Sequence, residues 1–298
     1  MSEPLYTPSV ARKVLERHGF VIKKSFGQNF LIDRHVLDDI VEAAMEGDEP
    51  GRSHKVAIEI GPGIGTLTQA LAESEFQPVI AIEKDRHLIP LLADTLADYP
   101  HVHVVSGDAL EVDFTELLSP FIETSALAQA SLRLVANLPY YITTPLIMRV
   151  LEARWPLHSA VVMVQKEVAK RMVASPGTKD YGALTVAVRY YSHPTLVRIV
   201  SPGCFLPNPG VDSAVVRLLI RDEPVASDVP RELFFRVVRA AFGQRRKTLA
   251  NALRSEFTEL SRDDVDTWFA DAGIDGVRRG ETLSMEEFVQ LGRSFLTR

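Results

Sequence analysis

Cysteine is almost absent from this chain of 298 residues, since Cys204 is the only one. A single thiol excludes an intramolecular disulfide and a zinc site built from cysteines. The sequence also has no apolar run near the roughly 18 residues that a membrane helix requires. Its first residues lack the apolar segment of a signal peptide, so we expect a protein of the reducing cytoplasm.

An excess of basic charge is missing too, because 39 acidic residues outnumber 33 lysines and arginines and give a net charge of −6. Spread evenly, this charge would not favour binding to nucleic acid. The basic residues are clustered, however: residues 236–247, RVVRAAFGQRRK, and residues 17–30, RHGFVIKKSFGQNF, contain no acid. Such patches are typical of a protein that grips a polyanion on one face, but also of solvated helix faces.

Short runs rich in β-branched residues alternate with helix-like segments through most of the sequence. The runs cover residues 55–61, 78–85, 101–110, 132–139 and 159–167. This alternation predicts a Rossmann-like, doubly wound α/β fold whose parallel sheet is covered by helices on both faces. Two later runs, residues 195–202 and 213–222, leave no room for a crossover helix, so we expect an antiparallel pair at the edge of the sheet.

The apolar spacing changes after the polar, proline-bearing segment 221–230. From there to the end, apolar residues recur every three or four positions, which predicts a series of helices. We therefore expect two domains, a ligand-binding α/β domain over residues 1–221 and a small helical domain over residues 222–298. The sequence contains no internal repeat and no low-complexity tract.

The segment EIGPGIGTLT, residues 59–68, joins the first predicted strand to a helix. Its glycines at alternate positions, Gly61, Gly63 and Gly65, allow a tight turn and the close approach of a ligand. The spacing differs from the G-x-G-x-x-G of dinucleotide enzymes, because Thr66 holds the sixth position. Glu59 makes the loop acidic, which suits a cationic ligand such as S-adenosylmethionine. A purely structural strand-to-helix turn is the alternative, since a lone glycine loop is weak support.

Two further acids follow predicted strands at the edge where open α/β sheets bind ligands. Glu83 ends the second strand, where a carboxylate can accept from both hydroxyls of a ribose. Asp108 follows the third strand and is placed to accept from the amino group of an adenine. Either residue could instead cap a helix, and Asp85 is a second choice beside Glu83.

The fourth predicted strand ends in Asn137-Leu138-Pro139-Tyr140. The Asn137 amide oxygen and the Leu138 carbonyl, held extended by Pro139, can accept from an aromatic amine, and Tyr140 can stack on its ring. Two acceptors would localise the nitrogen lone pair, so that orientation toward a methyl donor suffices without a general base. The arrangement predicts a socket for an adenine that leaves its helix or loop. A chance strand end with a buried tyrosine is the alternative.

Six sequence blocks in this order resemble the ribosomal RNA adenine dimethyltransferases of the KsgA type, over almost the whole chain. The blocks are residues 23–33, 59–68, 137–145, 165–172, 205–218 and 242–253. The resemblance implies a class I methyltransferase fold, S-adenosylmethionine as methyl donor and no metal. It implies N6,N6-dimethylation of two adjacent adenosines near the 3′ end of small-subunit rRNA during assembly of the 30S subunit.

The same resemblance implies roles for individual residues. The cofactor site would be formed by Gln28, Asn29, Leu31, Gly61, Gly63, Glu83, Asp108 and Asn137. Phe205, on the proline-fixed segment FLPNP, would cover the face of the target adenine opposite Tyr140, although a buried core position is the alternative. Arg245, Arg246 and Lys247 would contact phosphates of the rRNA.

Two rival functions stay open. A large-subunit rRNA adenine methyltransferase of the antibiotic-resistance type shares the glycine loop and the Asn-x-Pro-Tyr socket. A small-subunit assembly factor with incidental catalysis is the other. The basic block at residues 242–253 and the helical tail favour the small-subunit enzyme, which we expect to be a monomer that binds the assembling subunit and no membrane.

Overall fold

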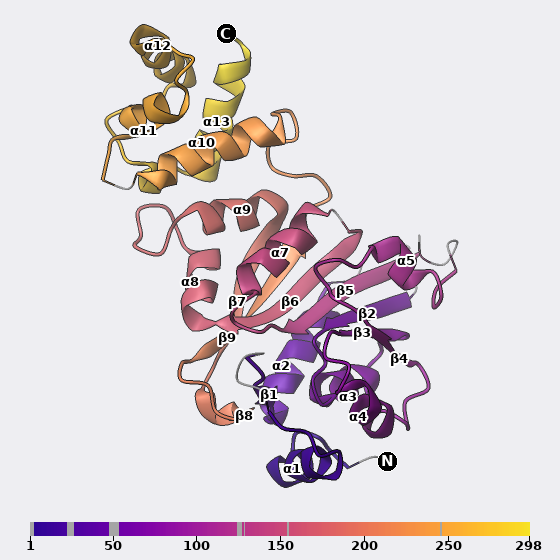
Figure 1. Cartoon of the computed structure of the whole chain (residues 1–298). Coiled ribbons are helices and arrows are strands. Elements are labelled where there is room, and N and C mark those ends of the chain that lie inside the picture. The colour runs from indigo at the N-terminus through magenta and orange to yellow at the C-terminus, as the bar shows by residue number, and fades with distance from the viewer. Residues whose placement is uncertain are drawn as a thin grey trace. The chain divides into compact units, whose positions relative to one another are not determined.

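The computed structural model describes residues 3–22, 27–47, 54–123, 127, 129–153, 155–244 and 246–298 (Figure 1). The chain divides into two compact units. The first comprises Met1–Ala169 and Thr195–Ile220, and the second comprises Lys170–Pro194 and Arg221–Arg298. Within the described residues, no helix has the length and apolar character needed to cross a bilayer.

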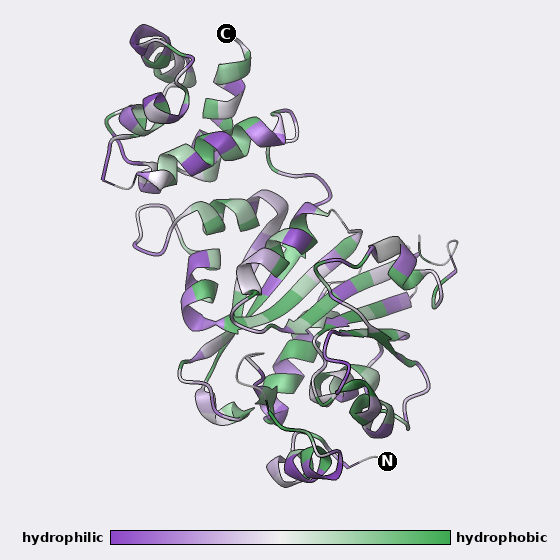
Figure 2. Cartoon of the chain, viewed as in Figure 1, coloured by the Kyte–Doolittle hydropathy of each residue, from purple (hydrophilic) through white to green (hydrophobic). Residues whose placement is uncertain are grey.

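The core of the fold is a seven-stranded sheet with the order β4-β3-β2-β5-β6-β9-β7. In that order the strands are Val102–Ser106, Val79–Glu83, His54–Ile60, Ala130–Asn137, Leu157–Gln165, Ser213–Ile220 and Ser192–Val200. The first five are parallel, whereas β9 runs antiparallel to β6. The predicted doubly wound sheet with an antiparallel edge is therefore confirmed. Every residue of β3 is buried, as expected for a strand covered on both faces, and hydrophobic residues follow the strands in Figure 2.

Helices and a small second sheet complete the first unit. The helices are α1 (Pro8–Arg17), α2 (Arg34–Met45), α3 (Thr66–Ala72), α4 (Ile89–Thr95), α5 (Phe114–Leu118) and α7 (Thr143–Glu152), with η2 at Pro202–Cys204. Helix α8 (Lys166–Val173) begins in this unit and ends in the second. The second sheet pairs β1 (Phe30–Leu31) with β8 (Phe205–Leu206) in antiparallel orientation. Strands of two residues are too short for any alternation pattern, and none was predicted here.

The direction of winding reverses at β2, which lies between β3 on one side and β5 on the other. The pairing of β2 with β5 sets Ile60 opposite Ala136, so both strands end at the same edge. Loops that follow such a reversal diverge to opposite faces and leave a crevice between them. The glycine loop and the Asn137 turn therefore begin side by side, although 77 positions separate Ile60 from Asn137 in the sequence.

The second unit is helical. Its elements are α9 (Ala183–Tyr191), α10 (Arg231–Gly243), α11 (Leu249–Glu256), α12 (Arg262–Ala272), η3 (Gly280–Thr282) and α13 (Met285–Leu296). Aromatic rings hold α9 against α10, because Tyr190 has ring centroids 4.8 Å from Phe234 and 5.0 Å from Phe235. Residues 170–194 thus cluster with the C-terminal helices, while a domain boundary drawn along the chain at residue 221 stays a prediction.

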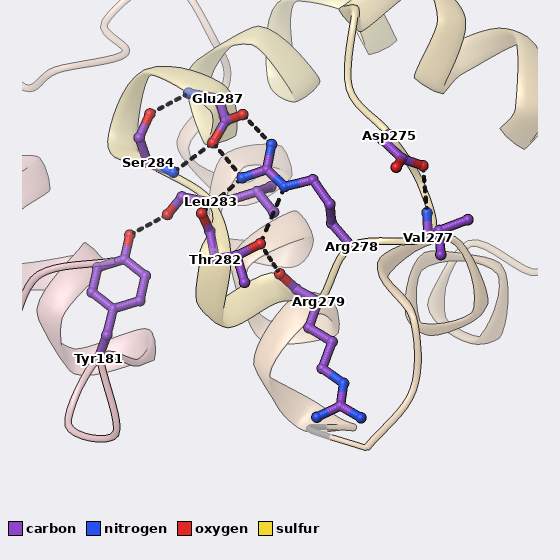
Figure 3. A network of polar contacts seen from close by, with 9 residues as sticks. All are labelled: Tyr181, Asp275, Val277, Arg278, Arg279, Thr282, Leu283, Ser284 and Glu287. Atoms are coloured by element: carbon purple, nitrogen blue, oxygen red, sulfur yellow. Dashed lines mark hydrogen bonds and ion pairs between the residues drawn. The ribbon is translucent and has the colours of Figure 1, made fainter. Parts of the chain in front are cut away.

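A polar network fixes the segment before α13 (Figure 3). The Arg278 guanidinium pairs with Glu287 and donates to the Thr282 carbonyl at 2.7 Å. Ser284 caps α13, since its hydroxyl accepts from the Glu287 amide at 3.2 Å. From α9's side of the unit, the buried Tyr181 hydroxyl donates to the Leu283 carbonyl at 2.8 Å. These contacts fix η3 and the residues after it at the start of α13.

We expect Gly280→Ala to destabilise this unit. A Cβ at residue 280 would lie 2.5 Å from the carbonyl oxygen of Ala241, and backbone of a packed helix has little freedom to move. The predicted loss is about 1–3 kcal/mol in the free energy of unfolding, measured by denaturant titration. Gly243→Ala is the matched control, because a Cβ there meets nothing within 4 Å. Equal unfolding free energies for the two variants would contradict this packing.

Candidate active site

A cleft partly open to solvent lies at the carboxyl ends of β2, β3, β4 and β5. Eleven of the twelve residues predicted for the cofactor and the socket line it. They are Gln28, Asn29, Leu31, Gly61, Gly63, Glu83, Asp108, Asn137, Leu138, Pro139 and Tyr140. The twelfth, Phe205, does not. Four strands and the segment before β1 thus contribute to one concave site, which is the usual form of a small-molecule site in this architecture.

The glycine loop follows β2 and adopts a conformation that favours glycine. Gly61 and Gly63 have φ angles of 71° and 60°, both in the left-handed region. At Gly63 a Cβ would also come within 2.9 Å of the Phe30 ring, so the loop and β1 approach closely only because this residue has no side chain. Gly65, with φ of 92°, precedes α3 as its N-cap. At its glycine positions the loop therefore presents backbone to the cleft.

Two carboxyl groups are buried together beneath this loop. Glu59 is 1% exposed, and its Oε2 atom has no hydrogen-bond partner. Burial raises the pKa of Glu59 to about 8, and the nearby Glu83 carboxylate acts in the same direction. Glu83 accepts from the Asp85 amide at 2.7 Å and from the Gly63 amide at 3.4 Å, and burial raises its pKa as well. Within the described part of the chain, no ion pair neutralises either carboxyl group, so the cleft favours a cation.

The acid beyond β4 has a different environment. The Asp108 carboxylate pairs with the Lys84 ammonium at 2.6 Å and accepts from the Leu110 amide at 3.0 Å. Pairing with Lys84 is the main reason that the pKa of Asp108 lies below its usual value. Lys84 was not predicted, because an exposed lysine after a strand carries no pattern of its own. Asp85, the alternative to Glu83 in the predicted site, accepts from the amide of His87 at 3.1 Å. This hydrogen bond closes the turn that follows β3.

The Asn137 turn is held from two directions. The Asn137 Nδ2 atom donates to the Asn29 carbonyl at 3.1 Å, and Asn29 Nδ2 donates to the Gly27 carbonyl at 3.0 Å. Because its nitrogen is used in this way, the amide has an assigned orientation and its oxygen is left for another donor. The Leu138 amide donates to the Met163 carbonyl at 3.1 Å, which continues the β5–β6 pairing past the end of β5.

Tyr140 lines the cleft with a half-buried ring. Its hydroxyl is hydrogen-bonded to Ser213 Oγ at 2.6 Å, with either group able to donate. Burial raises the pKa of Tyr140, so its phenol stays protonated near neutrality. The Thr143 hydroxyl donates to the Pro139 carbonyl at 3.1 Å and closes the turn into α7. The tyrosine therefore has a defined position rather than a free ring.

The remaining predicted residues lie elsewhere. The expected exposed ring of Phe205 is not found, because Phe205 is 1% exposed and packs in the core with residues such as Leu31 and Val215. Pairing of β8 with β1 turns this apolar ring inward, so the structure does not bring it to the cleft. Arg246 and Lys247 are exposed between α10 and α11, and Arg245 lies outside the described residues.

A model of the family described as ribosomal RNA adenine dimethylase matches residues 19–295. The chain belongs to this family. It is 46% identical over 297 residues to the ribosomal RNA small subunit methyltransferase A of Alkaliphilus metalliredigens, with 99% of each chain covered. The protein of the same name from Anoxybacillus flavithermus is 46% identical over 294 residues, which cover 98% of this chain and 96% of that one.

Two solved structures show the same fold. A dimethyladenosine transferase from Plasmodium falciparum is 26% identical, with a TM-score of 0.71 over 90% of this chain and 98% of that chain. The 23S rRNA methyltransferase ErmE is 27% identical, with a TM-score of 0.65 over 89% of this chain and 99% of that one. The family and its relatives thus agree with the class I methyltransferase fold expected from the sequence. Among the described residues, no group of histidine, cysteine or acidic side chains could hold a metal ion.

We expect Glu59→Gln to stabilise the ligand-free protein increasingly as the pH rises. The folded state holds the Glu59 proton up to a pKa of about 8, whereas the ordinary pKa of this side chain is 4.5. Glu59 therefore lowers the stability of the folded state progressively as the pH rises from 4.5 to 8. The variant should therefore match the parent near pH 4.5 and exceed it by a few kcal/mol at pH 8, measured by denaturant unfolding. Glu42→Gln, which removes an exposed carboxyl on α2, is the control. Parallel stability curves for parent and Glu59→Gln would show that Glu59 is not buried as a neutral acid.

Proposed function

We propose that the protein uses S-adenosylmethionine to dimethylate the N6 atoms of two adjacent adenosines near the 3′ end of small-subunit rRNA. The observation that carries this proposal is the common cleft of the acidic glycine loop and the Asn137 turn. Family membership supports the same reaction. The 46% identity to proteins named for the small subunit supports the choice of rRNA.

The residues of the cleft fit the proposed cofactor. Its amino group and sulfonium are cations, and Glu59 offers a buried carboxyl oxygen without a partner. Glu83 ends β3 where a ribose would lie, and Asp108 follows β4 where an adenine amine would donate. When bound, S-adenosylmethionine supplies an electrophilic methyl group. The protein would bind the cofactor through backbone groups and carboxylates and would direct its methyl group toward Asn137.

The Asn137 turn would activate the target amine. We assign the Asn137 side-chain oxygen and the Leu138 carbonyl as acceptors for the two N6 hydrogens, because the Asn137 nitrogen is already bound to Asn29. Accepting both hydrogens draws the nitrogen toward tetrahedral geometry and localises its lone pair. Tyr140 stacks on the adenine, a contact worth roughly 1–3 kcal/mol. Orientation of nitrogen toward the methyl group then supplies much of the rate, and the proton leaves readily once the nitrogen is alkylated.

The second candidate is a large-subunit rRNA methyltransferase, which the likeness to ErmE supports. Identity favours the first candidate, since ErmE is 27% identical and the small-subunit proteins are 46% identical. Mass spectrometry of both rRNAs, after incubation of unmodified subunits with protein and labelled S-adenosylmethionine, separates the two. Label on two adjacent small-subunit adenosines supports the proposal. Label confined to large-subunit rRNA would show that the second candidate is the correct function. If neither rRNA is labelled, only a binding role in assembly is left.

The proposal also includes the setting of the reaction. The substrate is small-subunit rRNA in the assembling 30S subunit, because selection of two particular adenosines must come from RNA shape. We place the protein in the cytoplasm as a monomer. Arg246 and Lys247, both exposed, contact phosphates together with Arg245.

We expect Asn137→Ala to lower the rate of methyl transfer on the order of a hundredfold or more, as for the loss of one preorganised polar group in other enzymes. Binding to the subunit should change little, because the phosphate contacts lie in the second unit. Single-turnover methylation and subunit binding by filtration measure the two effects. Turnover at the parent rate would refute the socket, whereas loss of both activities would indicate misfolding.

We expect Arg246→Glu to weaken binding to the small subunit and to make its salt dependence shallower. Each lost phosphate contact reduces the slope of log K against log[salt] by about 0.7 for single-stranded RNA. Arg262→Glu, at the exposed start of α12, carries the same change of charge and is the control. If both variants show the parent slope, the phosphate contacts lie elsewhere.

A further inference from the structure

We propose that Ser213 is a positioning residue that holds the tip of the Tyr140 ring in place for stacking on the target adenine. This inference rests on the proposed function. The two hydroxyls are hydrogen-bonded at 2.6 Å, a short distance for O–H···O. Ser213 is completely buried, so its hydroxyl has no exchange with bulk water and stays with this partner. Ser213 itself does not line the cleft, and it acts on the base only through the tyrosine.

Both ends of this hydrogen bond are anchored to β6. On one side, the Leu138 amide donates to the Met163 carbonyl, which fixes the turn that carries Tyr140. On the other side, β9 begins at Ser213, which lies opposite Gln165 in the antiparallel β6–β9 pairing. The distance between ring and hydroxyl is therefore set by three paired strands rather than by a flexible loop.

An ion pair strengthens the second anchor. The Lys166 ammonium pairs with the Asp212 carboxylate at 2.8 Å, and the Lys166 amide donates to the Asp212 carbonyl at 3.0 Å. These contacts tie the residue before Ser213 to the residue after β6. The start of β9 is consequently fixed in position, which a hydroxyl needs if it is to hold the tip of a ring in place.

The ring needs such a restraint because rotation about the first side-chain torsion of a tyrosine would swing the whole ring away from the base. A hydrogen bond at the hydroxyl opposes that swing. The hydrogen bond from Thr143 to the Pro139 carbonyl fixes the backbone of the turn and does not involve the Tyr140 ring. A methyl transfer that depends on aligning nitrogen with the methyl group is sensitive to small displacements, and a shift of about 1 Å can cost a hundredfold in rate. The raised pKa of Tyr140 keeps the phenol protonated, so the restraint persists through the neutral range.

The experiment compares variants in single-turnover methylation of unmodified small subunits. Ser213→Ala should lower the maximal rate about tenfold, while the KM for the subunit and the Kd for S-adenosylmethionine stay within about twofold. Ser213→Thr, which keeps the hydroxyl, should restore most of the rate. Ser159→Ala is the matched control, because Ser159 is also fully buried in the sheet and its hydroxyl has no partner.

A double variant separates positioning from mere stability. Tyr140→Phe leaves the buried Ser213 hydroxyl without its hydrogen-bond partner and should therefore reduce the free energy of unfolding. Removal of both hydroxyls is close to neutral for stability. Tyr140→Phe with Ser213→Ala should therefore recover the parent stability and stay slow. Recovery of rate together with stability would overturn the proposal, as would a parent rate for Ser213→Ala. If the parent protein itself does not methylate small-subunit rRNA, the proposed function fails before Ser213 is tested.

Discussion

The parallel pairing of β2 with β5 is the constraint on which the site depends. It sets Ile60 opposite Ala136, so that the glycine loop and the Asn137 turn leave the sheet at adjacent points. No hydrogen bond within either loop could create this proximity. A register shift by one residue would reverse which side chains face the crevice, and burial of both strands on two faces makes such a shift costly. The backbone of the sheet, more than any single side chain, brings the glycine loop and the Asn137 turn together.

Charge is the second feature that the fold must accommodate. Burying Glu59 and Glu83 without a positive partner costs free energy, and the raised pKa values express that cost. Proteins keep unfavourable buried groups chiefly where function requires them. A cationic cofactor would relieve this cost on binding. The affinity for such a cofactor is therefore linked to the protonation of Glu59 and Glu83. Asp108 differs from these two acids, because the Lys84 ammonium already neutralises its charge.

Much of this arrangement is predictable from sequence because it is local. The strands, the three glycines and the acids at strand ends follow from alternation and spacing, and the order of strands brings them together in any doubly wound sheet. Contacts between distant segments were not predictable. Ser213 is 73 positions from Tyr140, and no periodicity connects them. Phe205 shows the converse, since a ring on a proline-rich segment suggested exposure, while pairing of β8 with β1 turns it into the core. Residues 170–194 cluster with the C-terminal helices through aromatic contacts that the order of the chain conceals.

The most direct test is a crystal structure with S-adenosylmethionine, or a stable analogue with an amine in place of the sulfonium methyl. The account predicts that the transferable group points toward the Asn137 side-chain oxygen, with the amino-acid end of the ligand beside Glu59 and its adenine beside Asp108. A ligand bound in the reverse direction, or with its transferable group facing away from Asn137, would contradict the claim that one cleft serves both donor and acceptor.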